Sequence, residues 1–376
     1  MEGLILITDT LCDANGVSRF IQDIAKVAKD KNKNFKVITS TNKIYCDRLD
    51  NMLIFKPIFE IKMPFYPELS LVLPPCLKIY KEIKKQKPKA IHISTPGSVG
   101  LCGLIIAKIL KISVNSTYHT DFAEYIYANT KSKLLKSITR VYERFFYNRC
   151  KRVFLRSFVY KDLIANIFKI DKKRVFIIPP GIDIDRFDVN KRDKSYFEQF
   201  DIKKDATIAL YVGRVTKEKN IEFLLDLWKS NYKDELNAYL VIIGSGYLTK
   251  YKDSYYYNIR FLGHRDKEEL SIIYPSSDFF VFPSTTDTLG QVVIEAMANG
   301  LPVLVSDIGG PKTLIDILKP NGYILDSNNK EAWWSAIKRL IEDKTLREEL
   351  SKNALTHSKK YTIANSFDYF YERNLI

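Results

Sequence analysis

Two acidic residues that lie eight positions apart are the most informative feature of the sequence. Asp287 lies in a polar loop, residues 284–290, that follows a short apolar run, and Glu295 lies inside a helix expected to begin near Gln291. Asp287 then lies just before the first turn of the helix, and Glu295 lies about a turn and a half further along it. A carboxylate can accept both hydroxyl groups of a ribose, and the unpaired N–H groups of a first helical turn favour an anion. The spacing alone would also fit a purely structural role, in which Asp287 caps the helix and Glu295 lies at its surface.

A second group of charged residues follows another apolar run. Gly213 lets the chain turn after residues 207–212, and the cations Arg214 and Lys219 come next. Two fixed cations at a strand end suit a diphosphate, because the negative charge of that leaving group grows in the transition state. Together with the acidic pair, this loop predicts a phosphate-binding site.

Three further loops carry residues that could contact a substrate. His119 lies between Tyr118 and Asp121, just after the apolar run at 114–117. A lone histidine near a strand is more often structural. Asp121 fits two roles equally, orienting an acceptor or capping the next helix. Gly16, in the first loop, permits close approach of the backbone to a phosphate. Gly244 fits either a position beside a nucleotide base or a plain turn.

Strand-like and helix-like patterns alternate along the chain, and the alternation restarts once. The first set of strands comprises residues 4–8, 36–39, 90–93, 114–117 and 153–155, with helices such as 18–29, 77–85 and 133–149. The second comprises 175–178, 207–212, 238–243, 259–261, 279–282 and 302–305, with helices at 221–229, 267–275 and 292–299. This order predicts an α/β fold with two Rossmann-like, doubly wound domains in series. Ligands of such sheets bind at the carboxyl ends of the strands, where the charged loops lie.

These motifs together resemble glycosyltransferase family 4, a retaining family with the GT-B fold, in which two Rossmann-like domains face a central cleft. The resemblance is strongest over VFPSTTDTLGQVVIEAMANGLPV at residues 281–303, and it includes YVGRVTKEKN at 211–220 and YHTD at 118–121. It implies two catalytic residues, His119 and Asp287, and acceptor contacts from Tyr118 and Asp121. The donor-binding residues that it implies are Gly16, Arg214, Lys219, Gly244, Leu289, Gly290, Gln291 and Glu295.

The sequence departs from the family pattern at a few positions. Asp287 stands where the family usually has Glu, a variant that looks familiar in branches acting on lipid acceptors, and Asn220 replaces a Gly. The pair Asp183 and Asp185 has the spacing of a metal-binding Asp-x-Asp, but it resembles the ordinary interdomain turn of family 4. We therefore expect no metal and no cofactor other than the nucleotide-sugar co-substrate.

The resemblance implies an activity and a division of labour. We expect residues 1–168, completed by a C-terminal helix at 358–376, to form the acceptor-side domain, and residues 169–357 to bind the nucleotide sugar. The expected reaction is retaining transfer of a hexose from GDP-mannose or a UDP-sugar to a lipid or lipid-linked saccharide at the cytoplasmic face of the membrane. Two alternatives are a sugar-nucleotide epimerase of the same fold and an inactive partner or scaffold subunit.

Charge is unevenly distributed. Residues 1–180 carry 32 Lys and Arg against 15 Asp and Glu, whereas the remainder carries 27 against 29. The basic half suggests an anionic partner surface, although a lysine-rich composition that only adds solubility fits as well. We expect no nucleic-acid partner, because no nucleic-acid module is recognisable. Membrane contact is the alternative that we retain.

Two segments of the basic half bear on that contact. A helix at 133–146 gathers its apolar residues on one side, which fits either a core-packed helix or a basic face laid on anionic lipid. An aromatic-rich loop at 59–73 would reach the same surface. No apolar run approaches 18 residues and the N-terminus lacks the features of a signal peptide, so we expect a cytoplasmic protein peripheral to the inner membrane face. The five scattered cysteines are expected to be reduced.

Overall fold

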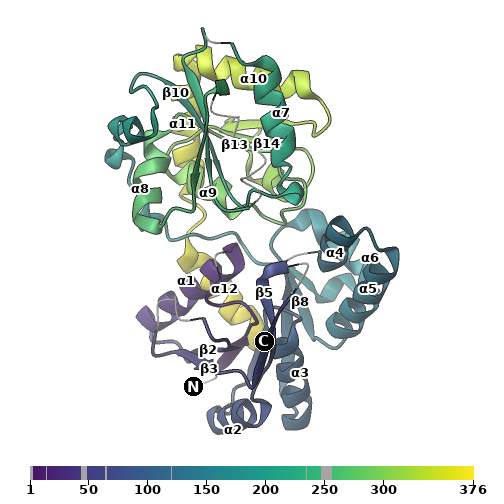
Figure 1. Ribbon diagram of the computed structural model, residues 1–376. Helices are drawn as coiled ribbons and strands as arrows, with labels where there is room; N and C mark the ends of the chain where they lie inside the picture. Colours follow the sequence, from purple (N-terminus) through teal and green to yellow (C-terminus); the bar gives the residue numbers. More distant parts are fainter. Residues whose placement is uncertain are drawn as a thin grey trace. The chain divides into compact units, whose positions relative to one another are not determined.

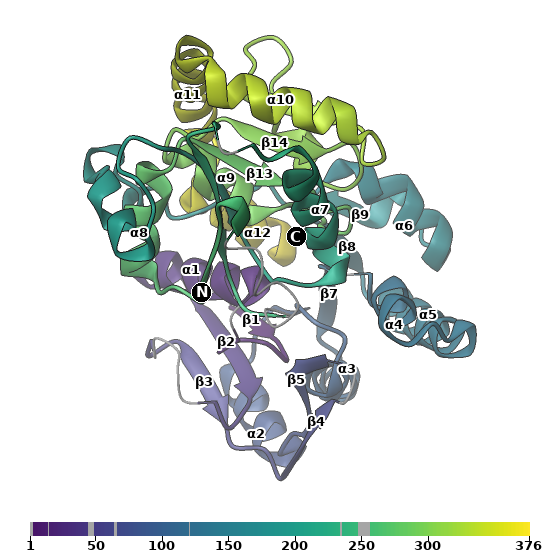
Figure 2. The same cartoon turned by 45° about the horizontal axis from the view of Figure 1, so that its top comes forward.

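The computed structural model of the chain describes residues 3–13, 15–43, 49–63, 66–119, 121–233, 235–246 and 256–376 (Figure 1). Only the backbone is described for residues 62, 63, 66–70, 128, 129 and 185. The chain forms two compact units, residues 1–182 with 362–376 and residues 183–361. Each unit is built on one main parallel sheet, which Figure 2 shows from a second direction.

The first unit has a seven-stranded sheet in the order β3-β2-β1-β6-β7-β8-β9. These strands are β1 (Leu4–Ile7), β2 (Phe35–Ser40), β3 (Met52–Phe55), β6 (Ala90–Ile93), β7 (Ser113–Tyr118), β8 (Arg152–Leu155) and β9 (Val175–Ile177). The helices are α1 (Gly16–Asp30), α2 (Cys76–Gln86), α3 (Ser98–Leu110), α4 (Phe122–Thr130), α5 (Lys133–Asn148), α6 (Lys161–Phe168) and α12 (Ile363–Leu375). One core cluster joins the sheet to α1 and α12, and another joins it to α2, α3, α5 and α6, so both faces are covered.

The second unit has a six-stranded parallel sheet in the order β12-β11-β10-β13-β14-β15. These strands are β10 (Thr207–Val212), β11 (Ala238–Ile243), β12 (Ile259–Gly263), β13 (Phe279–Phe282), β14 (Val303–Ser306) and β15 (Gly322–Leu325). The helices are α7 (Ile221–Asn231), α8 (Lys267–Ser276), α9 (Gln291–Ala298), α10 (Lys330–Glu342) and α11 (Lys344–Ser358). Figure 1 shows α7 and α8 on opposite sides of this sheet. The predicted α/β fold of two doubly wound sheets is confirmed.

The division between the units differs from the expected one. The strand at 175–178 was expected to begin the second sheet, but β9 pairs in parallel with β8 and completes the first. The division therefore falls after Ile182 and not after residue 168. At the other end, α12 packs against α1, and the Ile363 N–H donates to the Ile182 carbonyl. The alternating pattern could not assign β9 to a sheet, because it records the order of strands and not their pairing.

The segment expected to be a loop, residues 59–73, is a two-stranded antiparallel sheet. It consists of β4 (Phe59–Met63) and β5 (Tyr66–Leu73). Phe59 pairs with Leu73 and Ile61 pairs with Leu71, so these four side chains share one face, and each is more than half exposed. The hairpin therefore presents an apolar face at the surface of the first unit.

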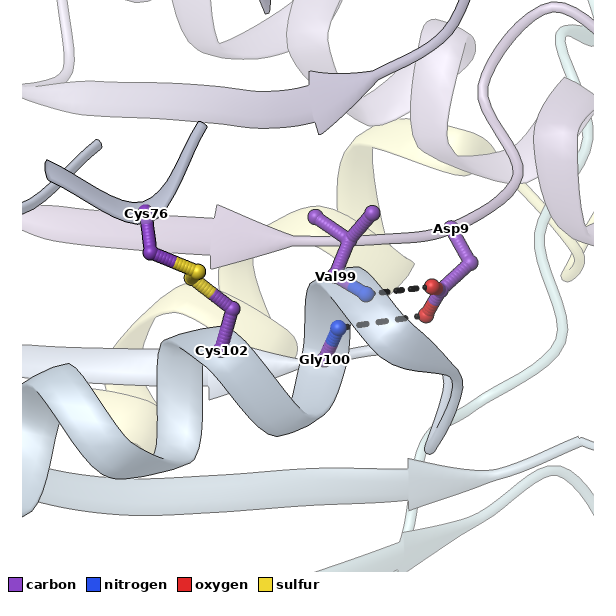
Figure 3. The surroundings of a disulfide bond; sticks show 5 residues. All are labelled: Asp9, Cys76, Val99, Gly100 and Cys102. Atoms are coloured by element: carbon purple, nitrogen blue, oxygen red, sulfur yellow. Dashed lines mark hydrogen bonds between the residues drawn. A yellow bond between two sulfur atoms is a disulfide. The ribbon is translucent and has the colours of Figure 1, made fainter. Parts of the chain in front are cut away.

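The expectation of reduced cysteines is wrong for three of the described ones, because Cys12, Cys76 and Cys102 are disulfide-bonded. Cys76, in the first turn of α2, and Cys102, in α3, form a disulfide, with Cα atoms 6.1 Å apart (Figure 3). Sequence spacing could not reveal it, because the two cysteines are 26 positions apart and the segment between them includes β6 and the loop that returns the chain to α3. Cys150 is a buried free thiol, and Cys46 lies outside the described residues.

Helix α5 also differs from expectation. Five apolar side chains of its stripe are exposed: Leu134 by 70%, Leu135 by 39%, Ile138 by 56%, Val141 by 67% and Phe145 by 44%. The face that packs on the core carries Glu143, Phe146 and Tyr147. Of the predicted stripe only Tyr142 and Phe146 pack on the core, so the core-packed interpretation is wrong for the other five side chains, which are part of the surface.

A buried histidine fastens α12 to the sheet. In the ring of His92, Nδ1 lies 2.8 Å from Oδ1 of Asn374, and Nε2 lies 2.8 Å from Oγ1 of Thr117. Asn115 donates to the same Asn374 oxygen at 3.1 Å. Burial lowers the pKa of His92 to about 3, against the smaller opposing effect of the Asn374 hydrogen bond. His92 is therefore neutral in the folded protein.

This neutral histidine predicts a pH dependence of stability. Between pH 6.5 and about 3 the unfolded chain binds a proton that folded His92 does not, so acidification favours unfolding by up to about 1.4 kcal/mol per pH unit. We expect the unfolding free energy of wild type, measured in urea by circular dichroism, to fall toward that of His92→Gln as the pH falls through this window. Replacement of the exposed His264 by Gln is the control. A pH-independent difference between wild type and His92→Gln would contradict this assignment.

Candidate active site

The two charged motifs of the second unit meet in the structure. Lys219 lies at the end of a 3₁₀ turn, Lys217–Lys219, and its Nζ donates to both carboxylate oxygens of Asp287, each at 2.8 Å. Beside this ion pair, Oγ1 of Thr286 donates to the carbonyl of Glu218 at 2.9 Å. The loops after β10 and β13, which are far apart in the sequence but follow neighbouring strands, are thus joined side by side.

The ion pair fixes the charge state of Asp287. Burial alone would raise the pKa of Asp287, but the Lys219 ammonium and the hydrogen bonds from Lys219 and Ser284 outweigh it, and the pKa is lowered. The carboxylate is therefore ionised at neutral pH. The Lys219 side chain is 12% exposed and that of Asp287 21%, so the pair remains within reach of a ligand.

Arg214 lies in the same loop. Its Nη2 is 3.2 Å from Oε1 of Glu218, and the Tyr211 hydroxyl donates to the Arg214 backbone carbonyl at 2.8 Å. Because Tyr211 is fully buried in β10, this hydrogen bond ties the loop to the sheet. The structure thus places Arg214 and Lys219 on one short, anchored segment, as the sequence predicted.

Glu295 is a buried member of α9. It is 2% exposed, and the Tyr274 hydroxyl of α8 donates to its Oε2 at 3.0 Å. A buried carboxylate needs such donors, because an unsatisfied oxygen would cost about 1–3 kcal/mol. Tyr274 was not predicted as a site residue, because no sequence pattern connects α8 with α9. Its only signal was an aromatic hydroxyl on a helix expected to pack against the sheet.

Close packing explains why two residues of the expected site are glycines. Gly290 has a φ of 76° at the start of α9, and a Cβ there would lie 2.8 Å from Cγ of Pro311. Gly244 has a φ of 138°, and a Cβ there would lie 1.9 Å from the Gly213 carbonyl oxygen. For Gly244, the close approach of two strand ends favours the interpretation as a turn.

The residues around Gly290 differ in exposure. Leu289 is buried, at 6% exposure, and its side chain packs inside the unit. Gln291 begins α9, and its Nε2 is a buried donor without a hydrogen-bond partner. Buried donors are rarely left unpaired, so Gln291 is available to bond a ligand at this helix start.

His119 lies in the first unit, directly after β7. Its Nε2 is 2.9 Å from Oγ of Ser94, the residue that follows β6. Burial first, and then the charge of Arg156, hold the pKa of His119 well below its usual value. His119 is therefore a neutral hydrogen-bonding group. Ser94 and Arg156 were not predicted, although each directly follows a strand of the parallel sheet.

The other expected residues of the first unit have structural contacts. Tyr118 is 1% exposed and packs edge-on against the rings of Tyr147 and Phe168, so its contacts in the structure are those of a core residue, and its acceptor role stays a prediction. Asp121 caps α4 by accepting from the Glu124 N–H at 3.0 Å. Its carboxylate also accepts two hydrogen bonds from Nη2 of Arg140, at 2.8 and 3.1 Å.

Gly16 is the first residue of α1. The helix has no acidic residue in its first turn, and the Asn15 side chain caps it by accepting from the Ser18 N–H. Within the described part of the chain, no three His, Cys, Asp or Glu side chains gather as they would around a metal ion. Asp183 of the Asp-x-Asp sequence pairs with Arg186, at 2.9 Å.

Family comparisons cover nearly the whole chain. Residues 14–186 match the family described as Glycosyltransferase Family 4, and residues 192–357 match the one described as Glycosyl transferases group 1. A sulfoquinovosyl transferase of Arabidopsis thaliana is 30% identical over 79% of this chain and 58% of its own length. An alpha-monoglucosyldiacylglycerol synthase of Streptococcus pneumoniae is 30% identical over 59% of this chain and 53% of its own. The matches thus span little more than half of these two relatives.

Solved structures support the fold. The Anabaena protein HepE, solved in complex with UDP and glucose, superimposes with a TM-score of 0.76, covering 98% of each chain at 16% sequence identity. At that identity the likeness concerns the architecture alone, which is GT-B.

The buried ion pair predicts a pattern of stabilities in the substrate-free protein. Lys219→Met leaves the Asp287 carboxylate without its cation and should destabilise the second unit by about 1–3 kcal/mol. Adding Asp287→Asn removes the uncompensated charge, so the double variant should be more stable than Lys219→Met. All three tryptophans lie in this unit, so tryptophan fluorescence in urea reports its unfolding. Additive losses from the two substitutions would contradict the coupling.

Proposed function

The chain belongs to glycosyltransferase family 4, and we propose that it is a retaining, metal-independent hexosyltransferase with a lipid or lipid-linked saccharide acceptor. The donor is a nucleotide-diphosphate sugar, GDP-mannose or a UDP-sugar. The observation that carries the proposal is the union of Lys219, Arg214 and Asp287 at the ends of β10 and β13. Two anchored cations at this place suit the diphosphate of such a donor.

The chemistry follows from the contacts of this loop. A donor diphosphate takes Lys219 from Asp287, and the two cations then face the oxygens of the leaving nucleoside diphosphate. As the bond between the sugar carbon and the phosphate oxygen breaks, negative charge gathers on that oxygen and the cations stabilise it. Asp287, released from Lys219, lies at the start of α9, where the Gln291 amide and the first N–H groups of the helix are available to the sugar.

His119 is the residue of the first unit that we assign to the donor sugar. As a neutral imidazole held by Ser94, it can accept or donate one hydrogen bond to a sugar hydroxyl without attracting the diphosphate. The buried Glu295, already supplied with a donor by Tyr274, is the residue that we assign to the ribose hydroxyls. These roles follow the family resemblance, and the geometry supports them.

The surface of the first unit supports a membrane acceptor. In the exposed apolar stripe of α5, the Arg149 guanidinium lies 3.4 Å from the ring centroid of Phe145, and residues 1–180 carry an excess of 17 positive charges. Apolar side chains that enter a bilayer, together with cations near anionic headgroups, bind a peripheral protein to the membrane. Among the described residues no helix is long and apolar enough to cross a membrane. The acceptor class agrees with the name of the diacylglycerol-modifying relative. We propose peripheral association with the cytoplasmic face.

The first test identifies the donor and separates the alternatives. Thermal-shift measurements with UDP- and GDP-sugars should reveal one preferred donor, and transfer assays with bacterial lipid extracts should then yield a glycolipid. Isomerised nucleotide sugar without transfer would identify an epimerase. Absence of nucleotide binding would instead indicate an inactive partner subunit.

The cation loop predicts a kinetic effect. At saturating donor, Lys219→Ala should lower kcat by about 10²–10³, because the leaving group loses a fixed cation. Lys217→Ala, which removes an exposed lysine two residues away, is the matched control and should leave kcat unchanged. Circular dichroism checks that both variants are folded. Full activity of Lys219→Ala would contradict the assigned role.

The apolar stripe predicts a change in membrane binding. Ile138→Glu should lower the partition onto vesicles containing phosphatidylglycerol by roughly tenfold or more, since burying one such side chain is worth about 1.5–3 kcal/mol. Ile317→Glu is the control, because Ile317 is 82% exposed but lies in the second unit. Co-sedimentation measures the partition. Equal loss in both variants, or no loss in Ile138→Glu, would exclude α5 as the contact.

A further inference from the structure

Arg156 is a buried arginine at the carboxyl edge of the first sheet. It directly follows β8, which ends at Leu155, so it lies in the connection to the next helix and not in the middle of the sheet. Its relative exposure is 5%. An arginine in this position is costly, because a guanidinium loses its hydration when it leaves water.

No anionic group in the described part of the chain compensates this charge. No carboxylate of the described residues lies within 4.0 Å of the guanidinium, and none of their hydrogen bonds involves Arg156. Nη1 is a fully buried donor without a partner. Burial lowers the pKa of Arg156 to about 9, and no neighbouring anion raises it. The side chain is thus still charged at neutral pH, with its five N–H donors unused.

The surroundings hold the guanidinium in place. Its central carbon lies 3.9 Å from the ring centroid of Phe20, a cation–π contact with α1. Arg156 is also close enough for its charge to lower the pKa of His119. Phe20 belongs to the second turn of α1, the helix that begins at Gly16. A fixed cation therefore lies against α1, near the start of a helix without acidic residues in its first turn, and its charge acts on His119.

We propose that Arg156 binds a phosphate group of a substrate at the carboxyl edge of the first unit. Phosphate oxygens match the planar, multi-donor guanidinium, and an ionised partner would supply the missing counter-charge. Phe20 fixes the plane of the guanidinium, and His119 contributes a neutral hydrogen-bonding group to the same ligand. The inference rests on the proposed glycosyl transfer for the identity of the ligand, but not for the existence of the site.

The phosphate has two possible sources. It is either part of the donor diphosphate or part of a phosphate-bearing acceptor, such as a phospholipid or a lipid-linked diphosphate. The site chemistry is the same in both cases. The two sources differ in which measured constant depends on Arg156. It is the dissociation constant of the donor nucleotide in one case and KM for the acceptor in the other.

The test uses the full chain and the variants Arg156→Met and Arg156→Lys. Titration calorimetry measures the dissociation constants of inorganic pyrophosphate and UDP, and steady-state assays measure KM for an acceptor with a phosphate and for diacylglycerol, which has none. Loss of one charge-assisted contact should weaken phosphate binding by about 10- to 150-fold. Arg156→Lys should recover part of it. The control is Arg152→Met, at the other end of β8, where the guanidinium donates to the Arg373 carbonyl.

Each outcome decides the proposal. Weaker UDP and pyrophosphate binding in Arg156→Met identifies the donor diphosphate as the ligand. Unchanged UDP binding with a raised KM for the phosphate-bearing acceptor alone identifies the acceptor. Equal constants in wild type, Arg156→Met and Arg152→Met would overturn the proposal, as would losses of equal size in both variants. If no transfer is found with any substrate pair, pyrophosphate binding that requires Arg156 still supports the site while the proposed reaction fails.

Discussion

A parallel sheet that is covered on both faces leaves only its strand ends for chemistry, and this constraint locates the candidate site in each unit. Strands β1, β6 and β11 are buried at every residue, because helices pack on both sides. The side chains that can meet a substrate are therefore those that directly follow a strand. His119 and Arg156 follow β7 and β8, whereas Arg214 and Asp287 lie in the loops after β10 and β13. The two sets belong to different units.

The two units treat buried charge differently. In the second unit, Lys219 and Asp287 neutralise each other, and Glu295 receives a hydrogen bond from Tyr274. In the first unit, Arg156 has neither a carboxylate nor a hydrogen bond among the described residues. A buried charge without a counter-charge lowers the free energy of unfolding, so Arg156 makes the first unit less stable in the absence of a ligand. That contrast separates a site that is electrostatically complete without a ligand from one that is completed by it.

Much of the fold and of the second unit's loops could be predicted because the decisive signals were local. The strands at 90–93, 207–212, 238–243 and 279–282 have the bounds expected from their apolar runs. What failed depended on contacts between distant segments. The pairing of β9, the disulfide of Cys76 and the hydrogen bond from Tyr274 to Glu295 have no sequence spacing of their own. For α5, the 3.6-residue period identified the residues that share a side but not the side that the core covers.

In the proposed reaction, the Lys219–Asp287 pair would also determine how the binding energy of the donor is divided between ground state and transition state. A donor that displaces Asp287 exchanges one anion for another at Lys219, so the net gain on binding is smaller than for an unpaired lysine. When the glycosidic bond to the diphosphate breaks, the added negative charge has no counterpart in the substrate-free loop, and the cations stabilise it in full. The ion pair that exists before substrate binds therefore weakens the attraction between Lys219 and the donor diphosphate more in the ground state than in the transition state. This difference is the condition under which a binding interaction raises kcat.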